Sequence, residues 1–596
     1  MVNTESRKKN SIRNIVFSML AYFIQSVLSF VVRRYFIYYL GTDYLGLNSL
    51  FTNILSILSF AELGFGAVIV FAMYKPMAEN DVEKVRQLLK FYKKCYAVIG
   101  CVVLIVGLAI IPFMGYFKTK APDVQENIVI VYLIFLFNSA LTYFFSHRRA
   151  LLYASQRNDI ESKVNILINV LLPVCQFLVL FLFRSYYLYI GLIGIMGLLN
   201  NLIVVAITQK KYLEYVEPPK TNLPKEDVNH IKKDIFAMFF HRLGSAVVTA
   251  TDSLLIYVLL GATLLGKYSN YLMITSAVSA ILGFFLNSLR GSVGNHIALK
   301  SREKNIDIFK KLNFLYMWLV SFCTIAIFCL SDPFIDVVLT KGAGGSLLFD
   351  KYIILLVSLN FYFNQSRFIV QIFKDCSGLF YQDRFRPLAE ALLNLVSSIV
   401  LGKFIGLAGI IIGTILSNVL INLWVEPYVL NKYYFKESTK KYLLKYLLNF
   451  VVMVGIGLIT YYTIGLLKSN SLGVLLIKFV ICAVLPNILY MLIYFRTSDF
   501  KYYVDLIKNF ITNIKKKHKA QDDKKVNVVG QTIFEQPCDL AEQVIENNCN
   551  VIENEAFLEN LEESENQNNE SNGSGTDNNI VENDEKSVNK DENTDK

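Results

Sequence analysis

Long apolar runs separated by short polar segments fill the first 495 positions of the chain. The runs are continuously apolar and show no two-residue alternation, so they predict membrane-spanning α-helices and argue against a closed β-barrel. The expected helices lie near 14–40, 45–73, 95–117, 127–147, 164–183, 188–208, 236–260, 266–290, 313–337, 351–372, 388–403, 405–427, 446–466 and 473–495. We therefore predict an all-α integral membrane protein with about fourteen transmembrane helices.

Composition supports this class, and the distribution of charge adds to it. Hydrophobic residues make up 54% of the 596 positions and charged residues only 18%, whereas soluble proteins carry roughly 25% charged residues. From Glu535 to the end there are 18 acidic and 3 basic residues, which leaves the first 534 positions with a net charge of +26. The overall charge of +11 therefore combines a cationic body with an acidic tail. The tail lacks the apolar density needed to fold, and we expect it to be disordered.

Basic residues fall in every second loop between the expected helices. The rich loops contain, among others, Lys84, Arg149, Lys211, Lys310, Arg384 and Lys441. The alternate loops are short and contain two or fewer basic residues each, such as Arg184 or Lys468. By the positive-inside rule, the rich loops and both termini face the cytoplasm. We expect a multi-pass protein of a cell membrane.

An internal repeat divides the body. Leu40-Gly41 and Leu45-Gly46 lie between the first two helices, and Leu260-Gly261 and Leu265-Gly266 lie between the seventh and eighth. The offset is 220 residues, and it also aligns charged positions of the following loops. The register then slips by a few residues, and both copies carry arginine at the corresponding span end, Arg148 and Arg149 in one and Arg367 in the other. Copies six helices apart keep the same orientation in the membrane, which is a common transporter design. The expected divisions are an N-terminal segment 1–13, an N-lobe 14–234, a C-lobe 235–430, a helix pair 431–500 and a tail 501–596.

Four stretches also carry a family resemblance. They are VVRRYFIYYLGTDYLGLNSLFTNILSILSFAELGFGAVIVFAMYKPMAE (31–79), HRLGSAVVTATDSLLIYVLLGATLLGKYSNY (241–271), GSVGN (291–295) and DCSGLFYQDRFRPLAEALLNL (375–395). Across about residues 10–495 the chain resembles the polysaccharide flippases of the multidrug/oligosaccharidyl-lipid/polysaccharide exporter superfamily. The resemblance implies two six-helix lobes that face each other across a cleft, plus two additional C-terminal helices.

Ionisable residues inside the expected helices are the candidates for function, because charge at membrane depth is costly. Arginine holds phosphate oxygens well and stays charged, so arginines within spans suggest an anionic cargo. The candidates for substrate binding are Arg33, Arg34, Arg242, Arg290 and Arg367. The candidates for ion coupling are Asp252 and Glu62. For each arginine the alternative is a structural salt bridge or snorkelling near an interface. For Asp252 and Glu62 a structural role is favoured. A partner for Asp252 must come from another helix, with Arg33 and Arg34 as candidates, unless the group is proton-linked.

We find no motif for a catalytic residue, a metal or another cofactor, and none for nucleic acid. Gly261–Tyr268 imitates a phosphate-binding loop, but Tyr268 stands where Ser or Thr would hold Mg²⁺, so we expect a tight turn instead. ATP hydrolysis within this chain is therefore not expected.

The leading hypothesis is a transporter that flips an oligosaccharide linked to a polyprenyl diphosphate, by alternating access between two lobes, for surface polysaccharide biosynthesis. Membrane lipids, H⁺ or Na⁺ as coupling ion, and the glycan polymerase and transferases of the pathway are the partners considered. A lipid II flippase and a drug or metabolite exporter of the same superfamily are alternatives. A membrane glycosyltransferase or glycan polymerase is less favoured, because the outer loops are short and no DxD occurs in the loops between the spans.

Overall fold

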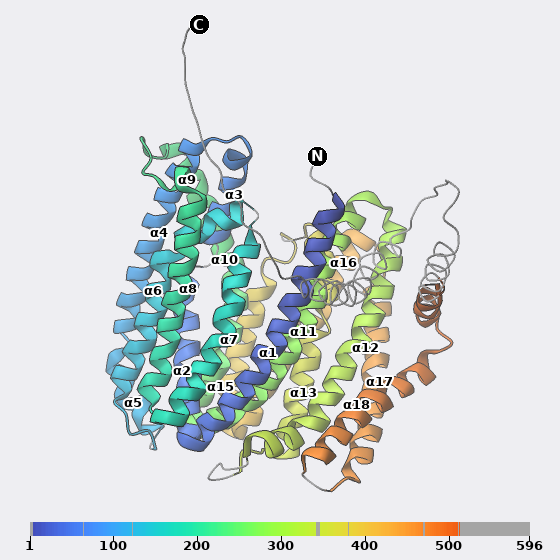
Figure 1. Ribbon diagram of the computed structural model, residues 1–596. Helices are drawn as coiled ribbons and strands as arrows, with labels where there is room; N and C mark the ends of the chain where they lie inside the picture. The colour runs from blue at the N-terminus through green and yellow to red at the C-terminus, as the bar shows by residue number, and fades with distance from the viewer. Residues whose placement is uncertain are drawn as a thin grey trace, which may run out of the picture. The chain divides into compact units, whose positions relative to one another are not determined.

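Helices make up the regular structure of the chain in the computed structural model (Figure 1). The structure describes residues 4–62, 65–121, 123–155, 157–340, 346–379, 381–468, 471–509 and 512, and within these ranges it contains no β-strand. Side chains are not described for 4–19, 236–250 and a few single positions.

The helical elements follow each other in simple order. They are α1 (Thr4–Tyr39), α2 (Thr42–Leu58), η1 (Ser59–Glu62), α3 (Phe65–Ala78), α4 (Val82–Leu108), η2 (Ile111–Phe113), α5 (Met114–Thr119), α6 (Ile128–Ala154), α7 (Asn158–Phe183), α8 (Tyr186–Lys211), α9 (Leu213–Val216), α10 (Lys225–Leu260), α11 (Ala262–Leu299), α12 (Arg302–Phe334), η3 (Ile335–Thr340), α13 (Lys351–Gln365), α14 (Phe368–Cys376), α15 (Arg386–Ser417), η4 (Asn418–Asn422), α16 (Leu423–Leu430), η5 (Asn431–Phe435), α17 (Thr439–Gly465) and α18 (Leu472–Tyr494). A further helix covers 498–509.

Eleven helical stretches of the described chain are long and apolar enough to cross a membrane. One of them, Arg386–Phe435, folds back on itself at Gly406, whose φ of +62° suits glycine, and the Ser398 hydroxyl donates to the Ile410 carbonyl at 3.2 Å across the two arms. This stretch therefore makes two antiparallel spans. The expected spans near 45–73 and 236–260 contain the shorter apolar helices Val68–Met77 and Thr251–Leu260. The predicted all-α architecture of about fourteen transmembrane helices is confirmed.

The turns between helices fall at two opposite ends of the body formed by Val16–Lys519. The hairpin end carries the short turns near 41, 120–127, 184–185, 261, 405–406 and 466–471. The basic end carries the segments 79–81, 155–157, 212–224, 300–301, 377–385 and 436–438, and most of its Lys and Arg residues lie on the helix ends that flank them.

Two bundles can be followed in Figure 1, one from α3 to α8 and one from α11 to α16. In the first, α4 and α8 pack on α6, and α7 packs on α8. In the second, α13 and α14 pack on α12 and α11, and α15 packs on α10 and α13. The final pair, α17 and α18, packs on α12, where the Trp318 indole N–H donates to the Asn487 side-chain oxygen at 2.8 Å. The bundles meet mainly where α2 packs on α11 and α10.

The buried apolar residues are distributed unevenly between the two ends. One core joins both bundles, and its members from the second bundle, such as Leu265, Ile354 and Leu407, lie in the half nearer the hairpin end. A second core, made of residues from Leu282 onward, lies wholly within the second bundle and its C-terminal helix pair. A third, around Leu152 and Val204, lies within the first bundle. Among the described residues, a shared core therefore joins the two repeats at the hairpin end.

Candidate transport site

The hairpin end begins its two central helices in the same way. Gly41 and Gly261 both have a φ of +96°, a backbone conformation that glycine adopts without strain, and α2 and α11 start at the next residue. The two glycines are 220 residues apart, so the repeat seen in the sequence is confirmed as a repeat of backbone geometry. The segment beginning at Gly261, whose sequence resembles a phosphate-binding loop, is a tight turn, as expected.

The first turns of α2 and α11 touch each other through glycines. A Cβ on Gly46 would lie 2.6 Å from the carbonyl carbon of Ala262, and a Cβ on Gly266 would lie 3.0 Å from that of Thr42. Ordinary contacts of a Cβ atom begin at about 3.4 Å, so neither position has room for a side chain. The same offset of 220 residues relates the two contacts. We call this contact, made by 41–46 and 261–266, the seam.

The carboxylate of Asp43 links the two helices of the seam by a hydrogen bond. Asp43 is buried and accepts a hydrogen bond from the Thr263 hydroxyl at 2.5 Å and a longer one from the Asp123 backbone N–H at 3.4 Å. Asp43 and Thr263 are themselves 220 residues apart, so they occupy the same place in the two repeats. The Ala262 backbone N–H also donates to the Lys120 carbonyl at 2.9 Å.

Arg33 lies directly below the seam on α1. Its Nη1 donates to the Ser269 hydroxyl of α11 at 2.9 Å, and that hydroxyl donates in turn to the Gly266 carbonyl at 2.7 Å. Tyr189 of α8 is close enough to interact electrostatically. No carboxylate whose side chain is described lies within 4.0 Å of Arg33, so within this part of the chain its charge is not neutralised. Arg34, next to it, is half-buried and forms no ion pair with a described residue.

Asp252 of α10 has a partner on the second arm of α15. The Thr414 hydroxyl donates to Asp252 Oδ2 at 2.7 Å and accepts from the Asn394 amide at 3.0 Å. Asp252 Oδ1 and Asn394 Oδ1 are buried without a hydrogen-bond partner. The partner of Asp252 therefore comes from another helix, as expected, but it is a threonine and not an arginine of α1. Two oxygens without donors make this spot suited to a small cation or a proton.

Glu62, the other candidate for ion coupling, lies apart from Asp252. It accepts a hydrogen bond from the Tyr96 hydroxyl of α4, inside the first bundle. No group of three or more His, Cys, Asp or Glu side chains suited to a metal ion occurs among the residues that the structure describes.

Arg290 and Arg242 complete the candidates on α10 and α11. Arg290 lies toward the basic end of α11, and its Nη1 is 4.0 Å from the Asp375 carboxylate of α14. Its side chain is half-exposed. Arg242 lies on α10, but its side chain is outside the described residues.

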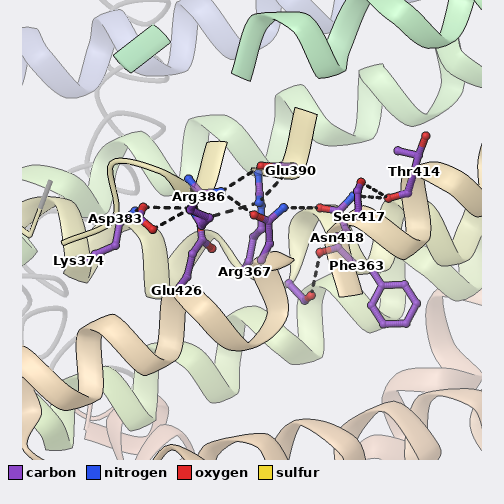
Figure 2. A network of polar contacts seen from close by, with 12 residues as sticks. Phe363, Arg367, Lys374, Asp383, Arg386, Glu390, Thr414, Ser417, Asn418 and Glu426 are labelled. Atoms are coloured by element: carbon purple, nitrogen blue, oxygen red, sulfur yellow. Dashed lines mark hydrogen bonds and ion pairs between the residues drawn. The ribbon is translucent and has the colours of Figure 1, made fainter. Parts of the chain in front are cut away.

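Arg367, the last candidate, belongs to a buried cluster of charges toward the basic end of the second bundle (Figure 2). It lies 3.6 Å from Glu390 and 3.9 Å from Glu426, between α13 and α14. We call the cluster, with its three positive and three negative side chains, the C-lobe ion cluster: Arg367, Lys374, Asp383, Arg386, Glu390 and Glu426. The charge of Arg367 is thus matched by buried carboxylates.

The first bundle contains a smaller counterpart. Arg149 of α6 lies 3.2 Å from the Glu161 carboxylate of α7 and donates to the Asn201 side-chain oxygen of α8 at 2.6 Å. Arg149 and Arg367 stand at corresponding helix ends in the repeat, as the sequence indicated. In both bundles a partly buried arginine links three consecutive spans.

The sequence analysis missed the uncharged polar residues of the second bundle. Asn394, Asn418 and Asn422 are almost fully buried, as is Glu426, whose side chain has no exposed area. The signal was available, because polar residues recur at every fourth position within two otherwise apolar spans, which places them on one helix face.

Comparison with known proteins agrees with this architecture. Residues 11–289 match the model of a protein family described as polysaccharide biosynthesis protein. No curated protein matches the chain by sequence.

Solved structures show the fold. A structure of the lipid II flippase MurJ in an inward closed conformation aligns with a TM-score of 0.58 at 15% identity, over 80% of this chain and 99% of that one. An inward-facing multidrug resistance MATE family transporter of the MOP superfamily aligns at 0.49 and 14% identity, over 68% and 94%. A mutant of the Vibrio cholerae MATE transporter VcmN aligns at 0.48 and 12% identity, over 73% and 98%. The chain is a multi-pass membrane protein with the fold of a lipid flippase.

Proposed function

We propose that this chain flips an anionic, lipid-linked oligosaccharide across a bacterial cell membrane by rocking its two lobes about the seam. One observation supports this most directly: the apolar core shared by the lobes is gathered at the hairpin end, and Arg33, which has no counter-ion among the described side chains, lies directly below the closed seam. A body joined at one end can admit cargo from the other. By the distribution of lysine and arginine, the basic end faces the cytoplasm.

The cargo follows from the charge of Arg33. An oligosaccharide on a polyprenyl diphosphate has about two negative charges and many hydroxyls that hydrocarbon does not solvate. A guanidinium below the seam would hold the diphosphate through charge-assisted hydrogen bonds. Arg34 and Arg290 extend the basic surface in this proposal, while Arg367 is kept for the C-lobe ion cluster. Moving two charges outward through ~100 mV, inside negative, releases roughly 4–5 kcal/mol.

Asp252 is the proposed site of ion coupling. Its unpartnered Oδ1, together with Asn394 Oδ1, offers oxygen ligands to a proton or a sodium ion at membrane depth. Occupation of this site would neutralise a buried charge between α10 and α15 and thereby favour one lobe arrangement.

A strain lacking this protein tests the proposal. Accumulation of lipid-linked oligosaccharide in the inner leaflet, with sugar transfer and polymerisation intact, is expected. Normal surface glycan together with altered drug sensitivity would instead indicate an exporter, and loss of transfer or polymerisation activity would indicate an enzyme. At residue level, Arg33→Ala should abolish export without lowering protein abundance, while Arg33→Lys should retain part of it. The control Arg302→Ala changes an exposed arginine at the basic end and should leave export intact.

Lipid II is the second candidate cargo, because the solved flippase with the TM-score of 0.58 is named for it. The two cargoes share the polyprenyl diphosphate, so Arg33 does not distinguish them. Rescue of a lipid II flippase depletion by this chain would favour lipid II; rescue of a surface-glycan flippase deletion alone would favour the oligosaccharide.

A further inference from the structure

Two rows of buried polar side chains face each other inside the hairpin formed by α15, η4 and α16. Within each row the residues recur at every fourth position, so each row lies along one face of its helix. We call the two rows the polar ladder: Arg386, Glu390, Asn394 and Ser398 on the first arm, and Thr414, Asn418, Asn422 and Glu426 on the second. All eight are classed among the buried residues of the bundle.

The hydrogen bonds along the second arm all point the same way. Arg386 Nη1 donates to Asn422 Oδ1 at 2.6 Å, the Asn422 amide donates to Asn418 Oδ1 at 3.0 Å, and the Asn418 amide donates to the Thr414 carbonyl at 3.1 Å. Figure 2 shows part of this series between Arg386 and Thr414. Hydrogen bonds that share one direction polarise and strengthen each other in a medium of low dielectric constant.

Thr414 joins this series to Asp252. Its hydroxyl has one hydrogen and two acceptors within reach, Asp252 Oδ2 at 2.7 Å and the Ile410 carbonyl at 3.2 Å. A charged Asp252 attracts that hydrogen, and a neutralised Asp252 leaves it to Ile410. The series from Arg386 therefore ends at the Thr414 carbonyl, and the separate hydroxyl of the same residue contacts a titratable or cation-binding carboxylate.

The opposite end of the series is shared with the C-lobe ion cluster. The same Arg386 Nη1 that donates to Asn422 also donates to Glu390 at 3.0 Å, and Glu390 lies 3.6 Å from Arg367. When the hydrogen bond from Arg386 to Asn422 weakens, the hydrogen bond from Arg386 to Glu390 becomes stronger. The segment between the ends is η4, a π-helix, a conformation that is rare and often found at functional sites.

We propose that Asn418 and Asn422 are positioning residues that couple occupation of Asp252 by a monovalent cation to the C-lobe ion cluster. This inference rests on the proposed ion site at Asp252. A cation there leaves the Thr414 hydroxyl to the Ile410 carbonyl, the resulting shift of Thr414 alters the hydrogen bonds of Asn418 and Asn422, and Arg386 moves toward its carboxylates. The C-lobe ion cluster joins α14 to the hairpin near the basic end, where the lobes have separate cores. The strength of this contact then depends on whether an ion is bound at Asp252.

The alternative is that the polar ladder only holds helices together, as polar residues in membranes commonly do at about 0.6 kcal/mol each. A purely adhesive role predicts a loss of stability without any change in the response to the ion. The two roles are therefore separated by measuring ion binding, not stability alone.

The experiment uses the full chain in detergent and follows its melting temperature as Na⁺ replaces choline at constant ionic strength, with a parallel pH series as the proton arm. The wild-type protein should be stabilised by one of these cations, and Asp252→Asn should abolish the response. Asn418→Leu should raise the cation concentration at the midpoint about tenfold, within the usual range of coupling between sites. The matched control is Asn200→Leu, which breaks a similar bond, Asn200 to Asn165 at 2.7 Å, in the other lobe.

An unchanged midpoint in Asn418→Leu, with the response still dependent on Asp252, overturns the coupling but leaves the ion site standing. An equal shift in Asn200→Leu also overturns it, since the effect would then be general. A wild-type response that survives Asp252→Asn refutes the proposed ion site itself. If Asn418→Leu does not fold, Asn418→Ala removes the same two hydrogen bonds without apolar bulk and is judged by the same midpoint; Asn418→Ser, whose hydroxyl can bond the Thr414 carbonyl, should recover part of the affinity.

Discussion

A methyl group added to the seam provides the sharpest test of how the lobes close. Gly46→Ala places a Cβ 2.6 Å from the carbonyl carbon of Ala262 and 2.9 Å from its Cα, both atoms of the backbone. Backbone atoms cannot swing aside as a flexible side chain does, so α2 and α11 must part by roughly 1 Å, an overpacking strain of about 1–3 kcal/mol. Gly266→Ala should act in the same way, because it meets the backbone of Thr42 and Gly46.

This strain exists only while the seam is closed. A cost of about 2 kcal/mol changes the ratio of closed to open seam by roughly 30-fold. Backbone amides of 42–47 and 262–267 should then exchange with deuterium up to about 30-fold faster in nanodiscs, if exchange there proceeds by opening of the seam. Flipping should slow, because a transporter that closes poorly at one end completes fewer cycles.

Gly283→Ala is the matched control. It adds the same methyl group to the same helix, α11, at a position where nothing lies within 4 Å of the new atom. Exchange at the seam should stay at the wild-type rate in this variant. If Gly46→Ala and Gly266→Ala exchange no faster than Gly283→Ala, the seam is not the contact that limits opening, and the proposed rocking about it is refuted.

Three further changes test other contacts. Asp43→Asn leaves one hydrogen-bond donor without its acceptor, either the Thr263 hydroxyl or the Asp123 backbone N–H. It should weaken the seam by about 1 kcal/mol and speed hydrogen exchange there roughly fivefold. Unchanged exchange would show that Asp43 does not stabilise the seam. Arg386→Ala removes a counter-ion from buried carboxylates and should cost about 3–5 kcal/mol, seen as a marked fall in melting temperature; a small fall would mean that the cluster relaxes or takes up protons. Asn487→Leu leaves the buried end of Trp318 without its acceptor and should cost about 1–3 kcal/mol, while export continues if the last helix pair serves only as support.

Much of the fold was readable from the sequence because hydropathy, helix length and loop charge are local properties. The spans, the all-α class and the 220-residue repeat needed no knowledge of which helices meet. The repeat even indicated the equivalence of Arg149 and Arg367 before either had a partner. The break between the spans 388–403 and 405–427 was predicted and lies at Gly406, whereas the division of 42–78 into α2, η1 and α3 needed the structure.

The roles of single residues were decided by tertiary structure. Asp252 finds Thr414, which is 162 positions away in the chain, and no local pattern specifies that pairing. Arg33 and Arg367 look alike as lone charges in apolar runs, yet one is left without a described counter-ion and the other is surrounded by carboxylates. The sequence by itself determined that charges lie within the membrane. The packing of helices distant in the chain decided which of those charges are neutralised, because the energy of a buried charge depends on the groups brought within a few ångströms of it.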